Sequence, residues 1–280
     1  MSNLDFRTAT QAHATAYVGD NAGTAIIFFS SGTATGTVIT VNPALGADPE
    51  TITIANPGTG TTSLNFSRAA VSGVNSFQFA DGTILIYGNT SNETLDGDAF
   101  ADLLFGNDGD DVITGNNGDD QIFGGNGADS LVGGEGSDLL KGNLGNDTQL
   151  GGNGNDFIFG GQGDDNLSGQ NGDDFVQGNL GADTINGNNG NDTLVGGQGA
   201  DSVNGGEDAD SIAAGNGDDV VNGGNGDDVV NGGNGNDNIG GDNGADSVDA
   251  GLGNDVVAGG EGNDTLLGSN GADSLDGGNG

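Results

Sequence analysis

The sequence predicts an all-β protein: a long parallel β-solenoid preceded by a small β-rich amino-terminal domain. From Gly97 to Gly280 the chain repeats every nine residues, with no insertion or deletion. Residues 1–87 lack this repeat and instead hold short Thr-rich segments separated by Gly, Pro, Asn and Asp. Neither region shows an apolar period of 3.6 residues, so no helix is expected.

The repeat frame reads G-G-x-G-x-D-x-U-x, in which U is an aliphatic residue. The frames that start at Gly133 and Gly151 show it in full. An Asp occupies the sixth place in twenty successive frames, and the eighth place is aliphatic in all of them except at Gln149. The fourth place is Gly apart from Phe100 and Asp208. A phase that holds over twenty cycles indicates a repeat architecture.

Each frame is expected to form one turn and one strand. Glycines permit the tight turn, and x-U-x gives a short strand with a single side chain facing inward. Two frames then close a coil of eighteen residues, and residues eighteen apart lie above one another. With strands stacked about 4.8 Å apart, twenty frames give a solenoid roughly 48 Å long.

Such a coil needs a cation. Ordering the backbone of one frame costs about 9 to 18 kcal/mol, whereas burying its one aliphatic side chain returns only about 1.5 to 3 kcal/mol. The sixth-place carboxylates also stack on both edges. Calcium fits because it takes six to eight oxygen ligands from carboxylates and carbonyls, whereas magnesium demands stricter geometry. Zinc would want His or Cys, and the chain has one His and no Cys.

The frames resemble the nonapeptide calcium repeats of the RTX (repeats-in-toxin), haemolysin-type calcium-binding proteins, which form a parallel β-roll with calcium between its coils. The resemblance covers residues 97–280. Residues 77–85, FQFADGTIL, are similar to an F-x-F-A-D-G-T stretch that accompanies such repeats. Residues 92–97 look like a degenerate opening frame with Glu93 where Asp belongs, so its calcium binding is in doubt.

The predicted metal ligands are the sixth-place aspartates. Residues 88–280 hold 37 of the 42 acidic residues and one Lys, which gives a net charge of −36. On the family's pattern the roll would hold roughly eighteen calcium ions, which would neutralise this charge. The twenty predicted ligands are Asp102, Asp111, Asp120, Asp129, Asp138, Asp147, Asp156, Asp165, Asp174, Asp183, Asp192, Asp201, Asp210, Asp219, Asp228, Asp237, Asp246, Asp255, Asp264 and Asp273.

A Gly-, Asp- and Asn-rich chain can also be a disordered acidic linker. A linker has no need of an aliphatic residue at every ninth position, and this favours the roll. Paired carboxylates such as Asp110 and Asp111 could suggest acid–base chemistry, but they recur as the fifth and sixth places of the frame, which favours a structural role. His13 stands alone, and no recognisable pattern supplies a base for a serine nucleophile.

Composition restricts the partners and the location. A net charge of −39 with three Lys plus Arg excludes an electrostatic nucleic-acid binder and argues against direct binding to an anionic membrane. No run approaches the 18 apolar residues of a membrane helix, and residues 1–20 lack the apolar core of a signal peptide. The RTX resemblance implies an extracellular location, secreted or at the cell surface, after export by a type I secretion machinery that reads an uncleaved carboxyl-terminal signal.

The amino-terminal domain, residues 1–87, is expected to be a small sandwich or an irregular β-solenoid. It is nearly neutral, with a net charge of −3. We discount an enzyme here because no catalytic constellation is present. The candidate strands are residues 14–18, 24–29, 37–41, 51–54, 63–66, 74–79 and 83–87.

The seventh and ninth places should point outward, and this gathers aromatic side chains on one face of the first half of the roll. A contiguous apolar strip on a solvated sheet indicates a contact surface, or a surface that the amino-terminal domain covers. The phenylalanines on or beside this face are Phe100, Phe105, Phe123, Phe157, Phe159 and Phe175.

Two functional hypotheses remain open. The first is a secreted calcium-binding structural protein, not an enzyme, that folds on meeting extracellular calcium and assembles into a surface layer, matrix or filament. The second is the calcium-binding portion of a larger secreted RTX toxin, adhesin or hydrolase. The sequence stops within a frame at residues 277–280, so either a carboxyl-terminal piece is missing or another chain covers the open end. Self-association is expected under the first hypothesis, and head-to-tail contact is one form that it can take.

Overall fold

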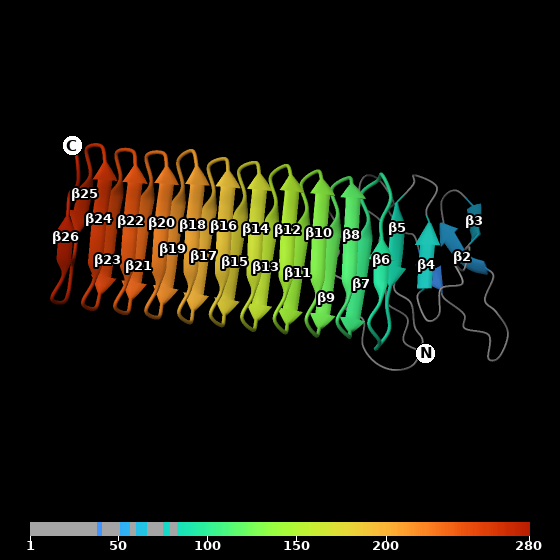
Figure 1. The fold of residues 1–280 in the computed structure, drawn as a ribbon. Helices are drawn as coiled ribbons and strands as arrows, with labels where there is room; N and C mark the ends of the chain where they lie inside the picture. The colour runs from blue at the N-terminus through green and yellow to red at the C-terminus, as the bar shows by residue number, and fades with distance from the viewer. Residues whose placement is uncertain (1–37, 41–50, 57–59, 66–74, 79–82) are drawn as a thin grey trace. The chain divides into compact units, whose positions relative to one another are not determined.

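The computed structural model describes residues 38–40, 51–56, 60–65, 75–78 and 83–280 (Figure 1). These residues form strands, turns and bends, with no helix among them. The chain divides into two compact units. The first contains Met1–Arg68 and Phe77–Phe79, and the second contains Ala69–Ser76 and Ala80–Gly280. The strands expected at residues 14–18 and 24–29 lie outside the described residues.

Three strands of the first unit form an antiparallel sheet in the order β1-β2-β3. They are β1 (Val38–Thr40), β2 (Thr51–Asn56) and β3 (Gly60–Asn65). Ile54 of β2 pairs with Ile39 on one side and with Thr62 on the other. The strands expected at residues 37–41, 51–54 and 63–66 are confirmed, with shifted ends. The choice between a sandwich and an irregular solenoid for this domain stays a prediction.

The second unit is built on two long sheets, and from β5 onward their strands alternate along the chain. The 12-stranded sheet contains β4 (Asn75–Gln78), β5 (Ile84–Tyr87), β7 (Leu103–Asp108), β9 (Gln121–Asn126), β11 (Leu139–Leu144), β13 (Phe157–Gln162), β15 (Phe175–Leu180), β17 (Thr193–Gln198), β19 (Ser211–Asn216), β21 (Val229–Asn234), β23 (Ser247–Leu252) and β25 (Thr265–Leu267). The 11-stranded sheet contains β6 (Thr94–Asp96), β8 (Val112–Asn117), β10 (Ser130–Glu135), β12 (Thr148–Asn153), β14 (Asn166–Asn171), β16 (Thr184–Asn189), β18 (Ser202–Glu207), β20 (Val220–Asn225), β22 (Asn238–Asn243), β24 (Val256–Glu261) and β26 (Ser274–Asp276).

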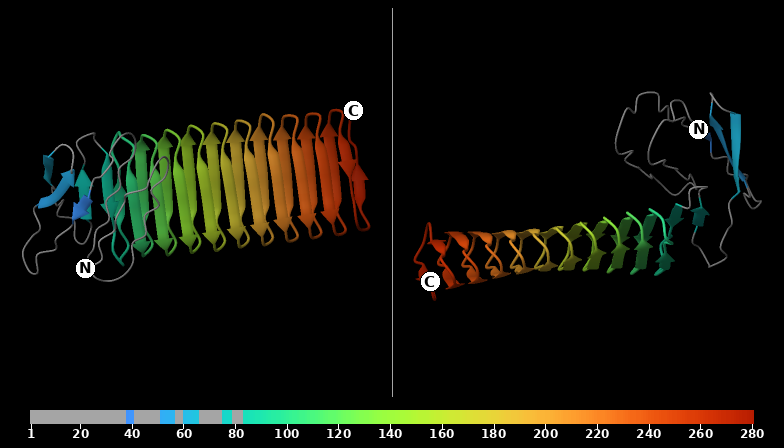
Figure 2. Two further views of the ribbon diagram at one scale, coloured as in Figure 1. Left: turned by 180° about the vertical axis from the view of Figure 1, so that it is seen from behind. Right: turned by 90° about the horizontal axis from the view of Figure 1, so that it is seen from above.

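From β5 and β6 onward, neighbouring strands in each sheet are parallel and eighteen residues apart. Leu104 pairs with Ile122 in one sheet, and Leu131 pairs with Gln149 in the other. Figure 2 shows the two sheets as stacked layers along the roll. The predicted parallel β-solenoid with an eighteen-residue coil is therefore confirmed.

The strands are longer than the three residues expected. Most span six residues, from the seventh place of one frame to the third place of the next. Backbone N–H and C=O groups inside a stack of coils need hydrogen-bond partners. The glycine segments provide these partners to the coils above and below. The N–H of Gly118, for example, donates to the carbonyl of Glu135 at 2.7 Å.

The turns depend on left-handed backbone at two places of the frame. The fourth-place Gly163 has φ 127°, and a Cβ there would lie within 3.0 Å of the backbone of the preceding coil. At the second place, Asn143 and Gln170 take φ 79° and 83°, and Asn is among the residues that tolerate this region best. Asp208, which replaces a fourth-place Gly, adopts φ 76°.

The core is a line of eighth-place side chains between the two sheets. From Leu95 to Val257 each is at most 2% exposed, and these residues form one continuous apolar cluster. Gln149 lies in this line and is 0% exposed. The strand does not slip to turn Leu150 inward, because Gln149 keeps the register of Leu131 and Leu167.

The 12-stranded sheet reaches back before the first frames of the repeat. In β5, Leu85 and Ile86 are each 5% exposed, and β5 pairs in parallel with β7 through Leu85 and Leu103. Residues 84–87 therefore share the sheet of the roll, although the sequence assigned them to the preceding domain. The division at residues 87 and 88 stays a prediction.

Candidate metal centre

The sixth-place aspartates line both edges of the roll at the end of each turn. From Asp102 to Asp255 all eighteen are buried, with 1–3% of their surface exposed, and only Asp264 and Asp273 in the last coils are half-buried. Buried carboxylates are costly unless something compensates their charge. The positions predicted from the frame thus come together as two columns of buried acids.

One oxygen of every carboxylate is committed to the backbone. Oδ1 of Asp120 accepts the N–H of Asp102 at 2.6 Å, and Oδ1 of Asp138 accepts the N–H of Asp120 at 2.8 Å. The same bond, from the residue eighteen positions earlier, recurs at all twenty aspartates at 2.6–3.1 Å. Each Asp therefore fixes the coil before its own.

The second oxygen has no such partner. Oδ2 of each aspartate from Asp111 to Asp264 is buried and accepts no hydrogen bond. Folded proteins leave only a few buried polar atoms unpaired per hundred residues, so eighteen carboxylate oxygens in regular columns require a ligand. A ligand for them must carry positive charge and must bind oxygen.

The space beside these oxygens is kept open by glycine. Oδ2 of Asp165 lies beside the first-place Gly160, so close that a Cβ on this residue would clash. The carbonyl oxygen of Gly178, in the next coil, borders the same space at 2.9 Å from that Cβ position. Each loop thus offers one free carboxylate oxygen with backbone carbonyls nearby.

The donor set fits calcium. Among the described residues no three His, Cys, Asp or Glu side chains converge on one point as a metal cluster. A cation in these loops would therefore complete its shell from backbone carbonyls, which calcium accepts in tolerant geometry. Zinc, which prefers His and Cys, does not fit this set.

Electrostatics also favours a bound cation. Burial, followed by the neighbouring carboxylates of the same column, raises the pKa of Asp165 and Asp174 to about 7. The same burial raises the pKa of Asp138 and Asp147 to about 6. At neutral pH the metal-free columns would hold protons that a divalent ion can displace.

The fifth-place carboxylates have another role. Asp173 is exposed, and its Oδ1 accepts both the backbone and the side-chain N–H of Asn191, which lowers its pKa. Its neighbour Asp174 is buried and has the raised pKa described above. The paired carboxylates therefore face different environments, and the fifth-place member links exposed turns of successive coils.

The first loops differ from the others. In the degenerate frame, Oε2 of Glu93 accepts the N–H of Asn89 at 2.9 Å and Oε1 accepts the hydroxyl of Ser91 at 2.7 Å. Oδ2 of Asp102 accepts the N–H of Asp98 at 2.7 Å, in contrast to the frames that follow. Both carboxylates are already hydrogen-bonded through both oxygens. The sequence raised doubt over Glu93. For Asp102 the available signal was Phe100 in place of the fourth-place Gly, which sequence reasoning did not use.

The aromatic side chains form a ladder on the outer face of the 12-stranded sheet. The rings of Phe105 and Phe123 stack at 4.9 Å with an interplanar angle of 11°, and Tyr87 tilts against Phe105 at 5.9 Å. Nζ of Lys141 lies 6.0 Å from the Phe123 ring and 5.3 Å from the Phe159 ring. Sequence reasoning missed Tyr87, although its eighteen-residue spacing from Phe105 is the signal that places it in the ladder.

Further along the sheet, Phe175 contacts both Phe157 and Phe159, at centroid distances of 6.0 and 5.7 Å. Phe157 is 54% exposed, whereas its partners are half-buried. The predicted gathering of aromatic residues is confirmed for these sheet positions. Its role as a contact surface stays a prediction, because most of its rings pack against one another.

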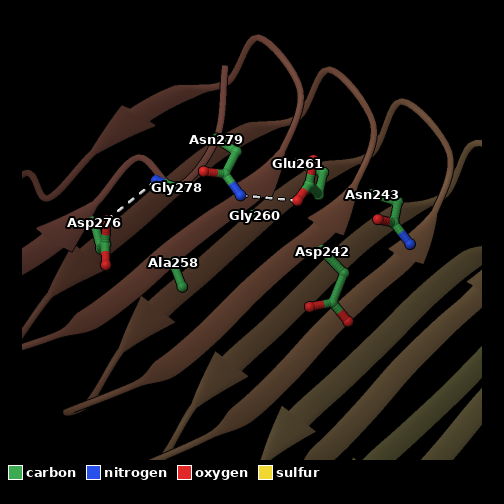
Figure 3. Close-up of a pocket in the computed structure, with 8 residues that line it drawn as sticks. All are labelled: Asp242, Asn243, Ala258, Gly260, Glu261, Asp276, Gly278 and Asn279. Carbon is green, nitrogen blue, oxygen red and sulfur yellow. Dashed lines mark hydrogen bonds between the residues drawn. The ribbon is translucent and has the colours of Figure 1, made fainter.

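An open depression lies on the last strands of the 11-stranded sheet (Figure 3). The N–H of Gly278 donates to Asp276, and the amide of Asn279 donates to Glu261 at 2.8 Å. None of the predicted metal ligands lines it. Its lining residues are Asp242, Asn243, Ala258, Gly260, Glu261, Asp276, Gly278 and Asn279.

Comparison with protein families matches the RTX calcium-binding nonapeptide repeat over residues 87–122, 114–149, 150–185, 177–212, 186–221, 204–239, 213–248 and 249–280. A search of curated proteins gave no match. In the part of the chain that the structure describes, no helix is long and apolar enough to cross a membrane. Repeats of this family bind calcium, typically in secreted proteins. The matched segments run from residue 87 to residue 280, and the chain belongs to the RTX calcium-binding nonapeptide repeat family.

Proposed function

We propose that the chain is a secreted calcium-binding structural protein whose roll folds when it meets extracellular calcium. The observation that carries the proposal is the pair of columns of buried Oδ2 atoms without hydrogen-bond partners, from Asp111 to Asp264. Calcium supplies the positive charge that these carboxylates lack. The chain supplies the carboxylates, the carbonyls of the glycine turns and the Oδ1 bonds that hold the coils in register.

The ligands in this proposal are the sixth-place aspartates. Those from Asp111 to Asp264 have a free, buried Oδ2, and Asp273 completes the column at the last coil. Asp102 enters as the weakest of the twenty, because both of its oxygens already accept backbone N–H groups. Binding would need the carboxylates ionised, so calcium and protons compete for the same oxygens.

The test is calcium titration of the full chain, followed by circular dichroism and calorimetry. Strand signal should appear cooperatively with calcium, and several ions should bind per chain. Asp165→Asn removes one charge and should reduce the bound calcium, whereas Asp164→Asn changes the exposed neighbour and should not. A roll that is fully folded in excess chelator would contradict the proposal.

Assembly into a surface layer, matrix or filament is the finer part of the proposal. Its support is the apolar ladder on one face of a roll whose other outward positions are mostly polar or small. Large exposed apolar patches on soluble proteins commonly mark contacts. Head-to-tail contact through the strand edges would generate a filament, because such contacts do not close on themselves.

Light scattering and electron microscopy in millimolar calcium test this assembly. Ordered polymers should form with the wild-type chain, and Phe157→Ser with Phe159→Ser should weaken their lateral contacts. Val229→Ser, an equally exposed apolar residue at the seventh place of a later coil, serves as the control. A chain that stays monomeric at high concentration would favour the second hypothesis.

The second hypothesis is that these residues are the calcium-binding portion of a larger secreted RTX toxin, adhesin or hydrolase. Family membership supports it as directly as it supports the first. Under either hypothesis we propose that the roll itself is not an enzyme and that export uses a type I secretion machinery. The full open reading frame of the gene distinguishes the two hypotheses, because a long continuation beyond residue 280 would assign the roll to a larger protein.

A further inference from the structure

The twenty frames are not equivalent at their first place. Eighteen have Gly there, and two have alanine instead: Ala214 in the frame of Asp219 and Ala250 in the frame of Asp255. Both alanines are 0% exposed, so their methyl groups point into the roll. The two frames therefore differ from the others beside the carboxylate.

In the glycine frames the space that a methyl group would take is bordered by the free carboxylate oxygen. A Cβ placed on Gly196 would lie 2.5 Å from Oδ2 of Asp201, and one on Gly232 would lie 2.8 Å from Oδ2 of Asp237. Distances below 3.0 Å are ones that real Cβ atoms essentially never show. All eighteen first-place glycines have an Oδ2 within that limit, and at Gly196 and Gly232 the carbonyl oxygen of the next coil is nearer still, at 2.3 and 2.5 Å. An alanine at this place therefore forces Oδ2 or that carbonyl oxygen to shift.

Either shift moves an oxygen that borders the proposed metal space. Oδ1 of Asp219 still accepts the N–H of Asp201 at 2.8 Å, and Oδ1 of Asp255 accepts the N–H of Asp237 at 2.9 Å. These distances match the glycine frames, so the carboxylates stay anchored and the coils stay stacked. Calcium–oxygen distances span only about 2.3 to 2.6 Å, so displacement of Oδ2 alters the site directly.

The two alanine frames lie on the same edge of the roll. Asp219 follows β19 and Asp255 follows β23, two coils apart, with the glycine frame of Asp237 between them (Figure 1). The column on the other edge, from Asp102 to Asp264, has glycine in every frame. The difference is therefore confined to one edge of the later coils.

We infer that the frames of Asp219 and Asp255 are weak calcium sites, which load after the glycine frames from Asp111 onward and leave one edge of the later coils under-occupied at limiting calcium. The inference rests on the proposed calcium function. In these frames a buried methyl group stands where the other frames keep open space beside Oδ2. Calcium dependence is then graded along the roll, and the segment from β19 to β24 orders at higher calcium than the first coils.

The experiment restores the space in the full-length chain. Ala214→Gly with Ala250→Gly should bind about two more calcium ions per chain at limiting calcium, because one site is repaired in each frame. The calcium midpoint for ordering of residues 211–258 should fall. Equilibrium dialysis with metal analysis gives the count, and hydrogen exchange gives the segment.

The matched control is Ala213→Gly, on the exposed outer face of the same strand. Replacement of alanine by glycine alone favours the unfolded chain, so a lower calcium midpoint in the repaired variant cannot come from the backbone. The converse variant, Gly178→Ala in the frame of Asp183, should lower the calcium count and delay ordering around that loop.

The outcomes separate this inference from the proposed function. A wild-type chain that binds no calcium overturns both. A wild-type chain that binds calcium, with the same count and midpoint in the repaired variant and in Gly178→Ala, overturns only the weak-site inference. A repaired variant that gains ions and orders its later coils earlier supports it.

Discussion

The first and second halves of the roll repeat the same nine-residue frame but differ in what packs around it. From Leu104 to Leu194 the eighth place is Leu or Ile in nine of eleven frames, whereas from Val203 to Val257 it is Val in five of seven. Each missing methylene removes about 0.8 kcal/mol of burial. The aromatic ladder also covers only the first half, and in the second half its column continues as Ala213, Asn231 and Asp249.

This difference distinguishes two sources of stability, the hydrogen bonds between coils and the apolar packing. The Oδ1 bonds between coils are equally short in both halves, with 2.8 Å at Asp147 and 2.9 Å at Asp237, so the stacking register does not depend on the packing. Apolar burial and ring contacts are larger in the first half. We therefore expect calcium to be needed throughout, and the second half to depend on it more strongly.

Calcium removal should have the largest effect. In excess chelator the strand signal of residues 88–280 should be lost, because the carboxylate columns repel and burial per coil falls several-fold short of the backbone entropy. Circular dichroism during stepwise chelation measures the loss, and hydrogen exchange should show residues 203–276 opening before residues 103–180. Simultaneous opening of both halves would show that the second half does not depend on calcium more strongly than the first.

Lower pH should partly replace calcium. The pKa of Asp120, Asp129 and Asp156 is raised from 3.8 to about 7 by burial, so the folded metal-free roll binds more protons than the unfolded chain between these values. Its stability is therefore greatest below about pH 4 and is lost as the pH rises towards 7. Strand signal in chelator should be larger at pH 4 than at pH 7.5.

The calcium midpoint should move in the opposite direction, because the metal needs ionised carboxylates. More calcium should be required at pH 5.5 than at pH 7.5. A calcium midpoint that does not change over this range would mean that the buried aspartates do not exchange protons for metal.

Loss of one ligand should also destabilise the neighbouring coils of the roll. Asp183→Ala should reduce hydrogen-exchange protection in the frames of Asp165 and Asp201 as well as its own, because Oδ1 of Asp183 accepts the N–H of Asp165 and its loop would share ions with its neighbours under the proposed function. Asp237→Ala in the second half should expose a longer segment. Asp164→Ala, an exposed fifth-place variant, is the control, and an effect confined to residue 183 would argue against coupled coils.

The aromatic ladder should matter only locally. Phe123→Ala removes the stack on Phe105 and the contact with Lys141, and should destabilise the first half by about 1 to 3 kcal/mol. Asn231→Ala changes the same place of the frame in the second half and should be close to neutral. Denaturant unfolding in saturating calcium measures both, and equal effects would show that the ladder adds no stability.

The smallest effect is expected at Gln149. Its Nε2 donates to the carbonyl of Phe159 at 2.9 Å, but its Oε1 is buried without a partner. Gln149→Leu removes an unpaired oxygen that costs about 1 to 3 kcal/mol and loses one hydrogen bond of about 0.5 to 1.5 kcal/mol. A stabilisation of about 1 kcal/mol is expected in thermal unfolding with calcium, and a loss of stability would mean that the bond to Phe159 outweighs the unpaired oxygen.

The sequence alone determined the repeat and its consequences. The nine-residue frame predicted the eighteen-residue coil, the inward line from Leu104 onward and the two columns of aspartates, because a fixed period places identical residues above one another. It also predicted the aromatic face, since side chains on a strand alternate between two sides. Strand length was wrong, because the periodic pattern does not reveal how far backbone pairing continues into the glycines.

Only the tertiary structure decided how each oxygen is used. The frame of Asp102 keeps its sixth-place Asp although Phe100 replaces a Gly, and only the structure shows that its Oδ2 accepts the N–H of Asp98. Ala214 looks like a harmless change until its position beside a carboxylate is known. Tyr87 joins the ladder because β5 pairs with β7. These contacts depend on packing and hydrogen-bond geometry within and between coils. The repeat pattern gives the type of residue at each place but not the atoms that it contacts.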